Sequence, residues 1–177
     1  MSADFALRLA TASDVASVVA LVNSAYRGES SRAGWATEAD LLGGVRIDVE
    51  RLATTMATEG NAVLVHEEDG DMVACVHLER RPTYSYLGML TTKPTLQANG
   101  VGRRMLAAAE AWAVEQWQSQ EMRMTVIVQR ETLIAWYERR GYVRTGETQR
   151  FPYGDERWGL PKRDDLAFCV LKKPLRP

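Results

Sequence analysis

A strand, a short loop and two glycines at the start of a helix follow one another between residues 87 and 104. Glycine has no Cβ, so its backbone can approach a ligand closely. The first turn of a helix also has free N–H groups and the positive end of the helix dipole, which favour phosphate. Arg103 and Arg104 add positive charge at the same point. The segment predicts a cradle for a diphosphate, although an ordinary tight turn would also account for the glycines.

Strand and helix patterns alternate along the rest of the chain, which predicts one α/β domain over residues 1–177. Two β-rich runs, 62–67 and 72–79, are joined by Asp69-Gly70 and indicate a hairpin, and residues 84–91 add a third strand. A long helix, a buried strand and a second helix ending at Gly141 follow. The other expected elements are strands at 7–9, 142–145 and 166–171, a helix after the Thr11–Asp14 capping box, short helices at 37–40 and 48–56, and loops over the rest of 23–44 and at 151–165.

Composition excludes several other classes of protein. The apolar fraction is 46%, the charged fraction 25% and the net charge −1, so nothing favours nucleic acid or an anionic membrane as a partner. The chain start lacks a signal-peptide pattern, and no apolar run is long enough to span a bilayer. Cys75 and Cys169 lie in apolar runs without metal or disulfide spacing, and we expect them to be buried. These features predict a cytoplasmic location.

Two motifs identify a resemblance. Gln97-x-x-Gly100-x-Gly102 is similar to the Q/R-x-x-G-x-G/A signature of the GNAT N-acetyltransferase superfamily, and residues 133–142 resemble its aromatic-Tyr-x-x-x-Gly-aromatic segment. The order of strands and helices matches from about Leu7 to Leu171. A P-loop would need Lys-Ser or Lys-Thr after its glycines, and a dinucleotide-binding fingerprint would need three glycines after the first strand.

The resemblance implies a mixed, mostly antiparallel sheet flanked by helices (α+β). Its central strands, 84–91 and 123–128, would splay to admit the pantetheine arm of acetyl-CoA. It also implies that Tyr137 protonates the departing thiolate, as the general acid. The residues expected to bind the cofactor are Leu90, Thr91, Thr92, Gln97, Ala98, Asn99, Gly100, Val101, Gly102, Arg103 and Arg130.

Some of these assignments have a simpler alternative. Without the resemblance, Tyr137 is more readily a core aromatic, and Gln97 could serve only to order its loop. Arg103 and Arg104 could form a solvated helix start, although two arginines suit a positive dipole end only when an anion is present. Arg130 stands where the family usually has an asparagine that contacts the cofactor. Arginine could still reach the pantetheine or a phosphate, but the asparagine's role is not carried over.

Elementary chemistry agrees with the role of Tyr137. The departing thiolate, whose thiol has a pKa near 8.5, can take a proton from a phenol of pKa about 10. The acceptor is harder, because an alkylammonium of pKa about 10.4 must lose a proton, at a cost of about 4–5 kcal/mol at pH 7. Glu79, which shares strand parity with His77, is the candidate general base, and a solvated strand face is the alternative.

The acceptor site is expected in loops, which vary most between related enzymes. Tyr26 and Glu29, after the first long helix, are the candidate acceptor contacts. Phe151, Tyr153 and Trp158 could line an acceptor pocket or pack their loop against the sheet. His66 and His77 have no metal-ligand spacing, so no metal is expected.

Together these observations predict direct transfer of an acetyl group from acetyl-CoA to a small-molecule or peptide amine, by a monomer or a homodimer. The alternatives are an O-acyltransferase or longer-chain acyltransferase of the same fold, and a non-catalytic sensor that binds acyl-CoA.

Overall fold

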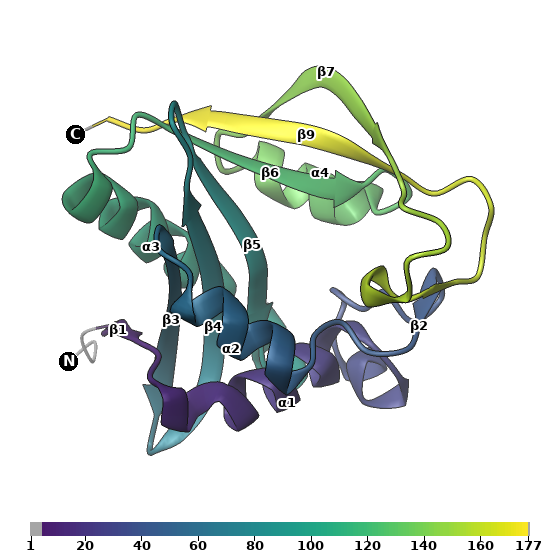
Figure 1. The fold of residues 1–177 in the computed structure, drawn as a ribbon, viewed down its shortest axis with the longest axis horizontal. Coiled ribbons are helices and arrows are strands. Elements are labelled where there is room, and N and C mark those ends of the chain that lie inside the picture. The colour runs from purple at the N-terminus through teal and green to yellow at the C-terminus, as the bar shows by residue number, and fades with distance from the viewer. Residues whose placement is uncertain (1–4, 177) are drawn as a thin grey trace.

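The computed structural model describes residues 5–176, and Figure 1 shows the fold. The helices are α1 (Val15–Tyr26), α2 (Val49–Ala57), α3 (Val101–Trp117) and α4 (Glu131–Glu138), with short 3-10 turns at Ala12–Asp14, Glu29–Ala33, Pro94–Asn99 and Glu156–Trp158. The strands are β1 (Arg8–Leu9), β2 (Leu42–Gly43), β3 (Asn61–Glu68), β4 (Asp71–Arg80), β5 (Ser85–Thr92), β6 (Glu121–Ile127), β7 (Val143–Arg150), β8 (Leu160–Pro161) and β9 (Ala167–Pro174).

Seven strands form one sheet in the order β1-β3-β4-β5-β6-β9-β7, and every pair except β5–β6 is antiparallel. Successive side chains of β3 and β4 point to opposite faces. Val63, Val65 and Cys75 pack against α1 and α2, whereas Leu64 and Val76 pack in the cluster that holds α3 and α4. The prediction of a mixed, mostly antiparallel sheet flanked by helices is confirmed.

The two central strands diverge, as the resemblance implied. β5 and β6 pair only at Ser85–Met122 and Tyr86–Arg123, and beyond that point they separate (Figure 1). A β-bulge in β5 places Met89 and Leu90 opposite a single residue of β4, and Met89 takes a φ of +50°. Bulges bend a strand and increase its twist. The bulge therefore accompanies the separation from β6.

Several local predictions are confirmed. The Thr11–Asp14 capping box is present, with the Thr11 N–H donating to Asp14 Oδ2 over 2.7 Å, and Gly141 takes a φ of +95° after α4. Cys75 and Cys169 are both free and buried. No helix in the described part of the chain is both long and apolar enough to cross a membrane.

Other local predictions are wrong. Residues 37–40 form no helix, and only 39–40 are in a turn, because the Thr37 hydroxyl accepts a hydrogen bond from the Ala39 N–H and bonds the Ser31 hydroxyl at 2.5 Å. Helix α1 continues through Tyr26, so that residue is not in the loop. The two stretches expected as loop contain β2 and β8, which pair with each other. Strands of two residues are too short to show a periodicity.

Candidate active site

Two cavities lie where β5 and β6 separate, and they share four lining residues: Tyr26, Leu90, Leu133 and Tyr137. We call the larger one the arginine cavity, because Arg27, Arg46 and Arg130 line it; its volume is about 740 Å³, including its open mouth. We call the other the helix-start cavity, because Gln97 and Gly102 line it; its volume is about 460 Å³ on the same basis. We call the place where these four shared residues lie the junction of the two cavities.

The Gln97 side chain lines the helix-start cavity and bridges two segments of its wall. Its Nε2 donates to the Thr92 carbonyl at 3.2 Å, and its Oε1 accepts from the Ala36 N–H at 3.0 Å. A Cβ at position 34 would lie 2.2 Å from that Oε1, so Gly34 gives the amide its space. Gln97 therefore orders its loop and joins the end of β5 to residues 34–36.

The start of α3 presents backbone donors next to this cavity. Gly100 precedes the helix with a φ of +78°, and no side chain caps it. The N–H groups of a first helical turn have no acceptor within the helix, so they are available to an anion. A Cβ at Gly102 would lie 3.3 Å from Thr92 Oγ1 and 3.7 Å from Trp136 Cζ2. The glycine thus keeps the approach to these amides open.

Arginines gather beside this helix start. Arg140 lies over the Trp136 ring, with Cζ 3.7 Å from the ring centroid, and donates to the Trp136 carbonyl. Burial lowers the pKa of Arg140, and the positive charges of Arg139 and Arg103 lower it further. Mutual repulsion of this kind favours a bound anion. Arg104 is placed differently, over the ring of Phe5 at 4.6 Å.

Tyr137 lies at the junction of the two cavities. Its ring is 5% exposed and packs edge-to-face against Trp136 and Tyr142. Burial raises the pKa of Tyr137 well above its usual range, and the neighbouring Tyr26 adds to the rise. Within residues 5–176 its hydroxyl has no hydrogen-bond partner, whereas the hydroxyl of Tyr142 donates to Glu110 at 2.8 Å. The phenol is therefore protonated and its hydroxyl is available to donate a hydrogen bond to a ligand.

Tyr26 approaches the same junction from α1. Its hydroxyl donates to the Leu90 carbonyl in the bulge of β5. Arg130 lies over its ring, with Cζ 5.7 Å from the centroid, and Arg46 lies near it at 5.9 Å. Tyr26 therefore links the bulged strand to the charged wall of the arginine cavity.

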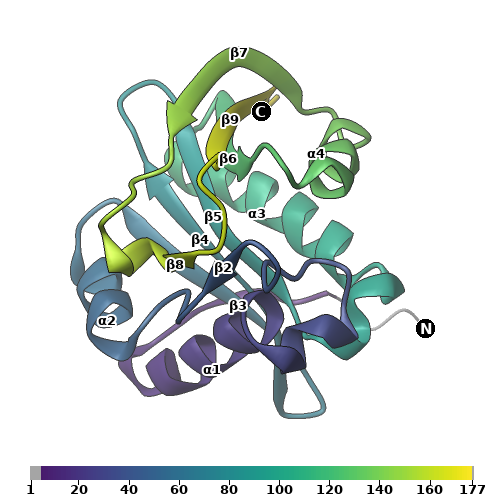
Figure 2. The ribbon, with the colours of Figure 1, turned by 90° about the vertical axis from the view of Figure 1, so that its right-hand side faces the viewer.

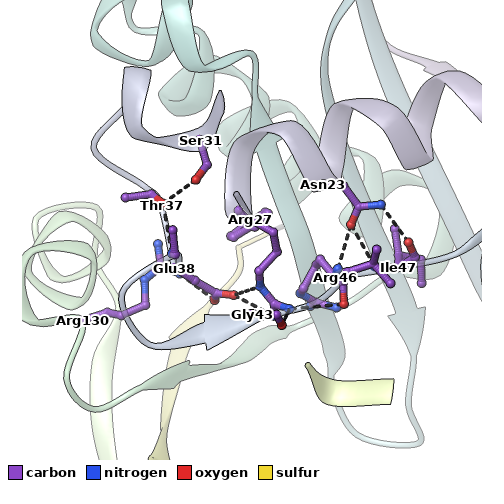
Figure 3. Close-up of polar contacts among 12 residues, drawn as sticks. Asn23, Arg27, Ser31, Thr37, Glu38, Gly43, Arg46, Ile47 and Arg130 are labelled. Carbon is purple, nitrogen blue, oxygen red and sulfur yellow. Dashed lines mark hydrogen bonds and ion pairs between the residues drawn. The ribbon is translucent and has the colours of Figure 1, made fainter. Parts of the chain in front are cut away.

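A buried ion cluster forms that wall (Figure 3). Glu38 Oε2 accepts from Arg27 at 3.0 Å, and Glu38 Oε1 accepts from Arg130 at 3.0 Å. All three side chains are at most 9% exposed. Burial alone would raise the pKa of Glu38, but the charges of Arg130, Arg27 and Arg46 outweigh it and lower that pKa. The carboxylate stays ionised and is engaged on both oxygens.

A roof of loops covers the arginine cavity. β2 and β8 pair as a short antiparallel ribbon, and Figure 2 shows it crossing the side where β5 and β6 part. The approach to Arg27 is close, since a Cβ at Gly159 would lie 2.6 Å from Arg27 Nη1. Phe151 and Trp158 line the cavity from this roof, whereas Tyr153 packs on Phe151 and accepts from the Leu166 N–H. Phe151 and Trp158 thus line a cavity, as one interpretation predicted, whereas Tyr153 packs within its own loop, as the other predicted.

The structure does not bring every candidate residue together. Glu79 lies outside both cavities and pairs with Arg81 at 3.0 Å, and Glu29 is exposed and pairs with Arg32. Ala98 and Asn99 are exposed on the 3-10 turn before α3. Arg130, expected near the cofactor, directs its guanidinium to Glu38 and the Ala36 carbonyl.

Sequence reasoning missed Arg27, Glu38 and Arg46, which carry most of the charge in the arginine cavity. They are separated along the chain and belong to no motif. His77, near Glu79, bonds Asn61 through Nε2 at 2.7 Å. Over residues 5–176, no group of three or more His, Cys, Asp or Glu side chains has the arrangement of a metal site.

Comparisons with known proteins agree with this geometry. Residues 39–153 match the model of the family described as acetyltransferase (GNAT) domain. No curated protein sequence matches the chain.

Solved structures match over most of the chain. The ribosomal-protein-S18-alanine N-acetyltransferase of Escherichia coli superposes with a TM-score of 0.70 at 14% identity, covering 97% of this chain and 94% of its own. The ribosomal-protein-alanine N-acetyltransferase of Brucella melitensis gives 0.70 at 21%, covering 96% and 99%. A Bacillus anthracis protein assigned as a streptothricin acetyltransferase, solved with acetyl coenzyme A, gives 0.57 at 15%, covering 70% and 68%. At these identities the likeness shows the fold.

Proposed function

The chain belongs to the acetyltransferase (GNAT) family, and from that premise we propose that it transfers the acetyl group of acetyl-CoA directly to an amine. In this proposal the cosubstrate occupies the helix-start cavity and the amine enters through the arginine cavity. The observation that carries the proposal is the unengaged hydroxyl of Tyr137 at the junction of the two cavities.

Acetyl-CoA supplies a thioester whose carbonyl carbon the amine attacks. The C–N bond forms, the C–S bond breaks, and the thiolate needs a proton, which Tyr137 donates from its hydroxyl. Burial keeps this phenol protonated. The amides at the start of α3 and the cluster of Arg103, Arg139 and Arg140 are suited to the phosphates at the other end of the cosubstrate.

Removal of a proton from the amine is the remaining requirement. Among the described residues that line the arginine cavity, Glu38 is the only carboxylate, and two arginines hold it ionised. It is therefore a weak base. The positive charge of the wall instead lowers the pKa of a bound ammonium. The α-amine of a peptide, with a pKa of about 7.7–8.0, needs less help than a lysine-like amine, and α-amines in general are less basic than the lysine amine, so we propose α-amines as acceptors. Two structural neighbours are named as alanine N-acetyltransferases, which supports this choice.

The test is release of coenzyme A thiol from acetyl-CoA with a panel of amines, followed with a thiol reagent. Cys75 and Cys169 are buried, and burial raises the pKa of Cys75 to about 12, so the protein's own thiols contribute little signal. We expect Tyr137→Phe to lower turnover by about 10²- to 10⁴-fold. Calorimetry should find acetyl-CoA affinity nearly unchanged, because the phenol acts on the leaving sulfur.

Tyr84→Phe is the matched control, since Tyr84 lies outside both cavities, against Arg123. Equal turnover in Tyr137→Phe and the wild type would remove Tyr137 from the mechanism. Binding of acetyl-CoA without turnover of any amine would favour the sensor alternative. Acetylation of alcohols or transfer of longer acyl chains at higher rates would favour the other acyltransferases.

A further inference from the structure

The arginine cavity has an excess of positive charge. Three arginines and one glutamate line it, which leaves two positive charges uncompensated by the described residues around it. Glu38 cannot balance more than it does already, because each of its oxygens is bound by a different arginine. A cationic amine entering this space would be repelled unless it brought a negative charge of its own.

Arg46 is the arginine of this wall that stays available. Arg27 and Arg130 are engaged by Glu38, and Arg27 also donates to the carbonyls of Gly43 and Val45. Arg46 is half-buried, and no carboxylate in residues 5–176 pairs with it. Its Cζ lies 5.9 Å from the centroid of the Tyr26 ring, which is at the junction of the two cavities.

The backbone that carries Arg46 is fixed. Asn23 Oδ1 accepts from the N–H groups of Arg46 at 2.7 Å and Ile47 at 3.2 Å, and Asn23 Nδ2 donates to the Ile47 carbonyl at 2.9 Å (Figure 3). Asn23 lies in α1, one turn before Tyr26. The backbone from which the Arg46 side chain extends is thus positioned relative to Tyr26 by the same helix. A guanidinium can bind a carboxylate through two parallel hydrogen bonds.

We propose that the acceptor is a small amine that also carries a carboxylate, and that Arg46 binds this carboxylate in the arginine cavity. The inference rests on the proposed function. The carboxylate offsets the charge of Arg46, while Arg27 and Arg130 remain with Glu38 and disfavour the ammonium form of the nearby amine. Arg46 thereby sets the acceptor class without contacting the thioester.

The experiment compares matched acceptors. The kcat/KM for acetylation is measured for the twenty amino acids, for their primary amides, and for short peptides with a free amino end and an amidated carboxyl end. Each value is expressed per unprotonated amine, because an amino acid and its amide differ in the pKa of the amine. We expect the wild type to prefer at least one amino acid over its amide by about 10- to 100-fold, the worth of a charge-assisted hydrogen-bonded pair. Arg46→Gln should abolish that preference mainly through KM, and Arg46→Lys should restore part of it.

The control variant is Arg80→Gln, because Arg80 is exposed at the end of β4 and lines neither cavity. Calorimetry with acetyl-CoA, run on each variant, shows that its fold and cosubstrate site persist. If acetyl-CoA does not bind the wild type, the proposed function fails and takes this inference with it. If it binds, and amides or amidated peptides are acetylated as well as the acids, or no acid is acetylated, only the inference is overturned. A preference that survives in Arg46→Gln overturns the role of Arg46.

Discussion

The two cavities share a wall but are built in different ways. The helix-start cavity joins the end of β5 and the segment into α3 to residues of α1, the turn at 35–36 and α4, and none of the described residues that line it is charged. The arginine cavity draws its charged residues from the end of α1, the loop before β2, the loop before α2 and the start of α4. Within the helix-start cavity the motif residues Gln97 and Gly102 are neighbours in the sequence, whereas each charged residue of the arginine cavity comes from a different segment.

The largest expected effect tests whether the cluster of Arg27, Glu38 and Arg130 stabilises the arginine cavity and the fold around it. Glu38→Gln leaves Arg27 and Arg130 buried without a counter-charge, so we expect a loss of about 3–5 kcal/mol in the free energy of unfolding. Urea denaturation measures it. Glu29→Gln is the matched control, because its salt bridge to Arg32 is exposed, and we expect a change of about 0.5 kcal/mol or less. A similar loss of unfolding free energy in the two variants would mean that the Glu38 cluster does not stabilise the cavity.

The next prediction concerns the helix-start cavity alone. Gly102→Val places methyl groups against Thr92 and Trp136 and obstructs the amides of the α3 start. We expect acetyl-CoA affinity to fall by about 2–3 kcal/mol, the worth of one charge-assisted hydrogen bond or slightly more. Calorimetry measures it.

Ala111→Val, on an exposed position of the same helix, should leave acetyl-CoA affinity unchanged. If Gly102→Val binds acetyl-CoA as tightly as the wild type, the cosubstrate does not bind at the start of α3. The helix-start cavity would then not be the cosubstrate site.

A smaller effect comes from His77. Burial, together with the smaller effect of the charges of Arg46 and Arg81, lowers its pKa to about 4, so the unfolded chain binds this proton more readily than the folded protein. Stability should therefore fall as the pH drops from about 6.5 to about 4, by about 2 kcal/mol after allowing for partial exposure. Urea titrations of the wild type and His77→Gln measure it. A slope that His77→Gln does not reduce would contradict the assignment.

The smallest effect tests how far the field of the arginine cavity extends. Removing one positive charge in Arg46→Gln should raise the pKa of His77 by less than about one unit, because burial is the larger cause. Proton NMR of the imidazole measures it. An unchanged His77 pKa in Arg46→Gln would mean that the charge of Arg46 does not act beyond the arginine cavity.

The same contrast explains what could be predicted from the sequence. Gln97, Gly100 and Gly102 stand close together, and their resemblance to the family signature predicts a cofactor site where the spacing alone would also fit a tight turn. The antiparallel meander and the splayed strands followed from hydrophobic patterns and from the resemblance. Tyr137 was singled out by its distance from Gly141 in a known motif; the structure places it at the junction, and its role as the acid is a proposal.

The arginine cavity could not be predicted in this way. Arg27, Glu38 and Arg46 meet only because the turns after α1 fold back under β8, and no pattern of neighbours signals such a meeting. Glu79 has the parity of His77, but its carboxylate extends along the end of β4 to Arg81, away from both cavities. Parity predicts a face of the sheet and not a position along it.

The β2–β8 ribbon has a consequence for exchanging parts between relatives. The segment that matches the family ends at residue 153, yet Trp158, Gly159 and Phe168, which roof or line the arginine cavity, come later, and Arg27 comes earlier than residue 39. A chimera that grafts only residues 39–153 into a homologous scaffold would carry Arg46 and Arg130 but leave Arg27 and Glu38 to the host, so it would divide the buried ion cluster between two parents. An exchange that keeps the arginine cavity whole must therefore extend beyond the family match at both ends.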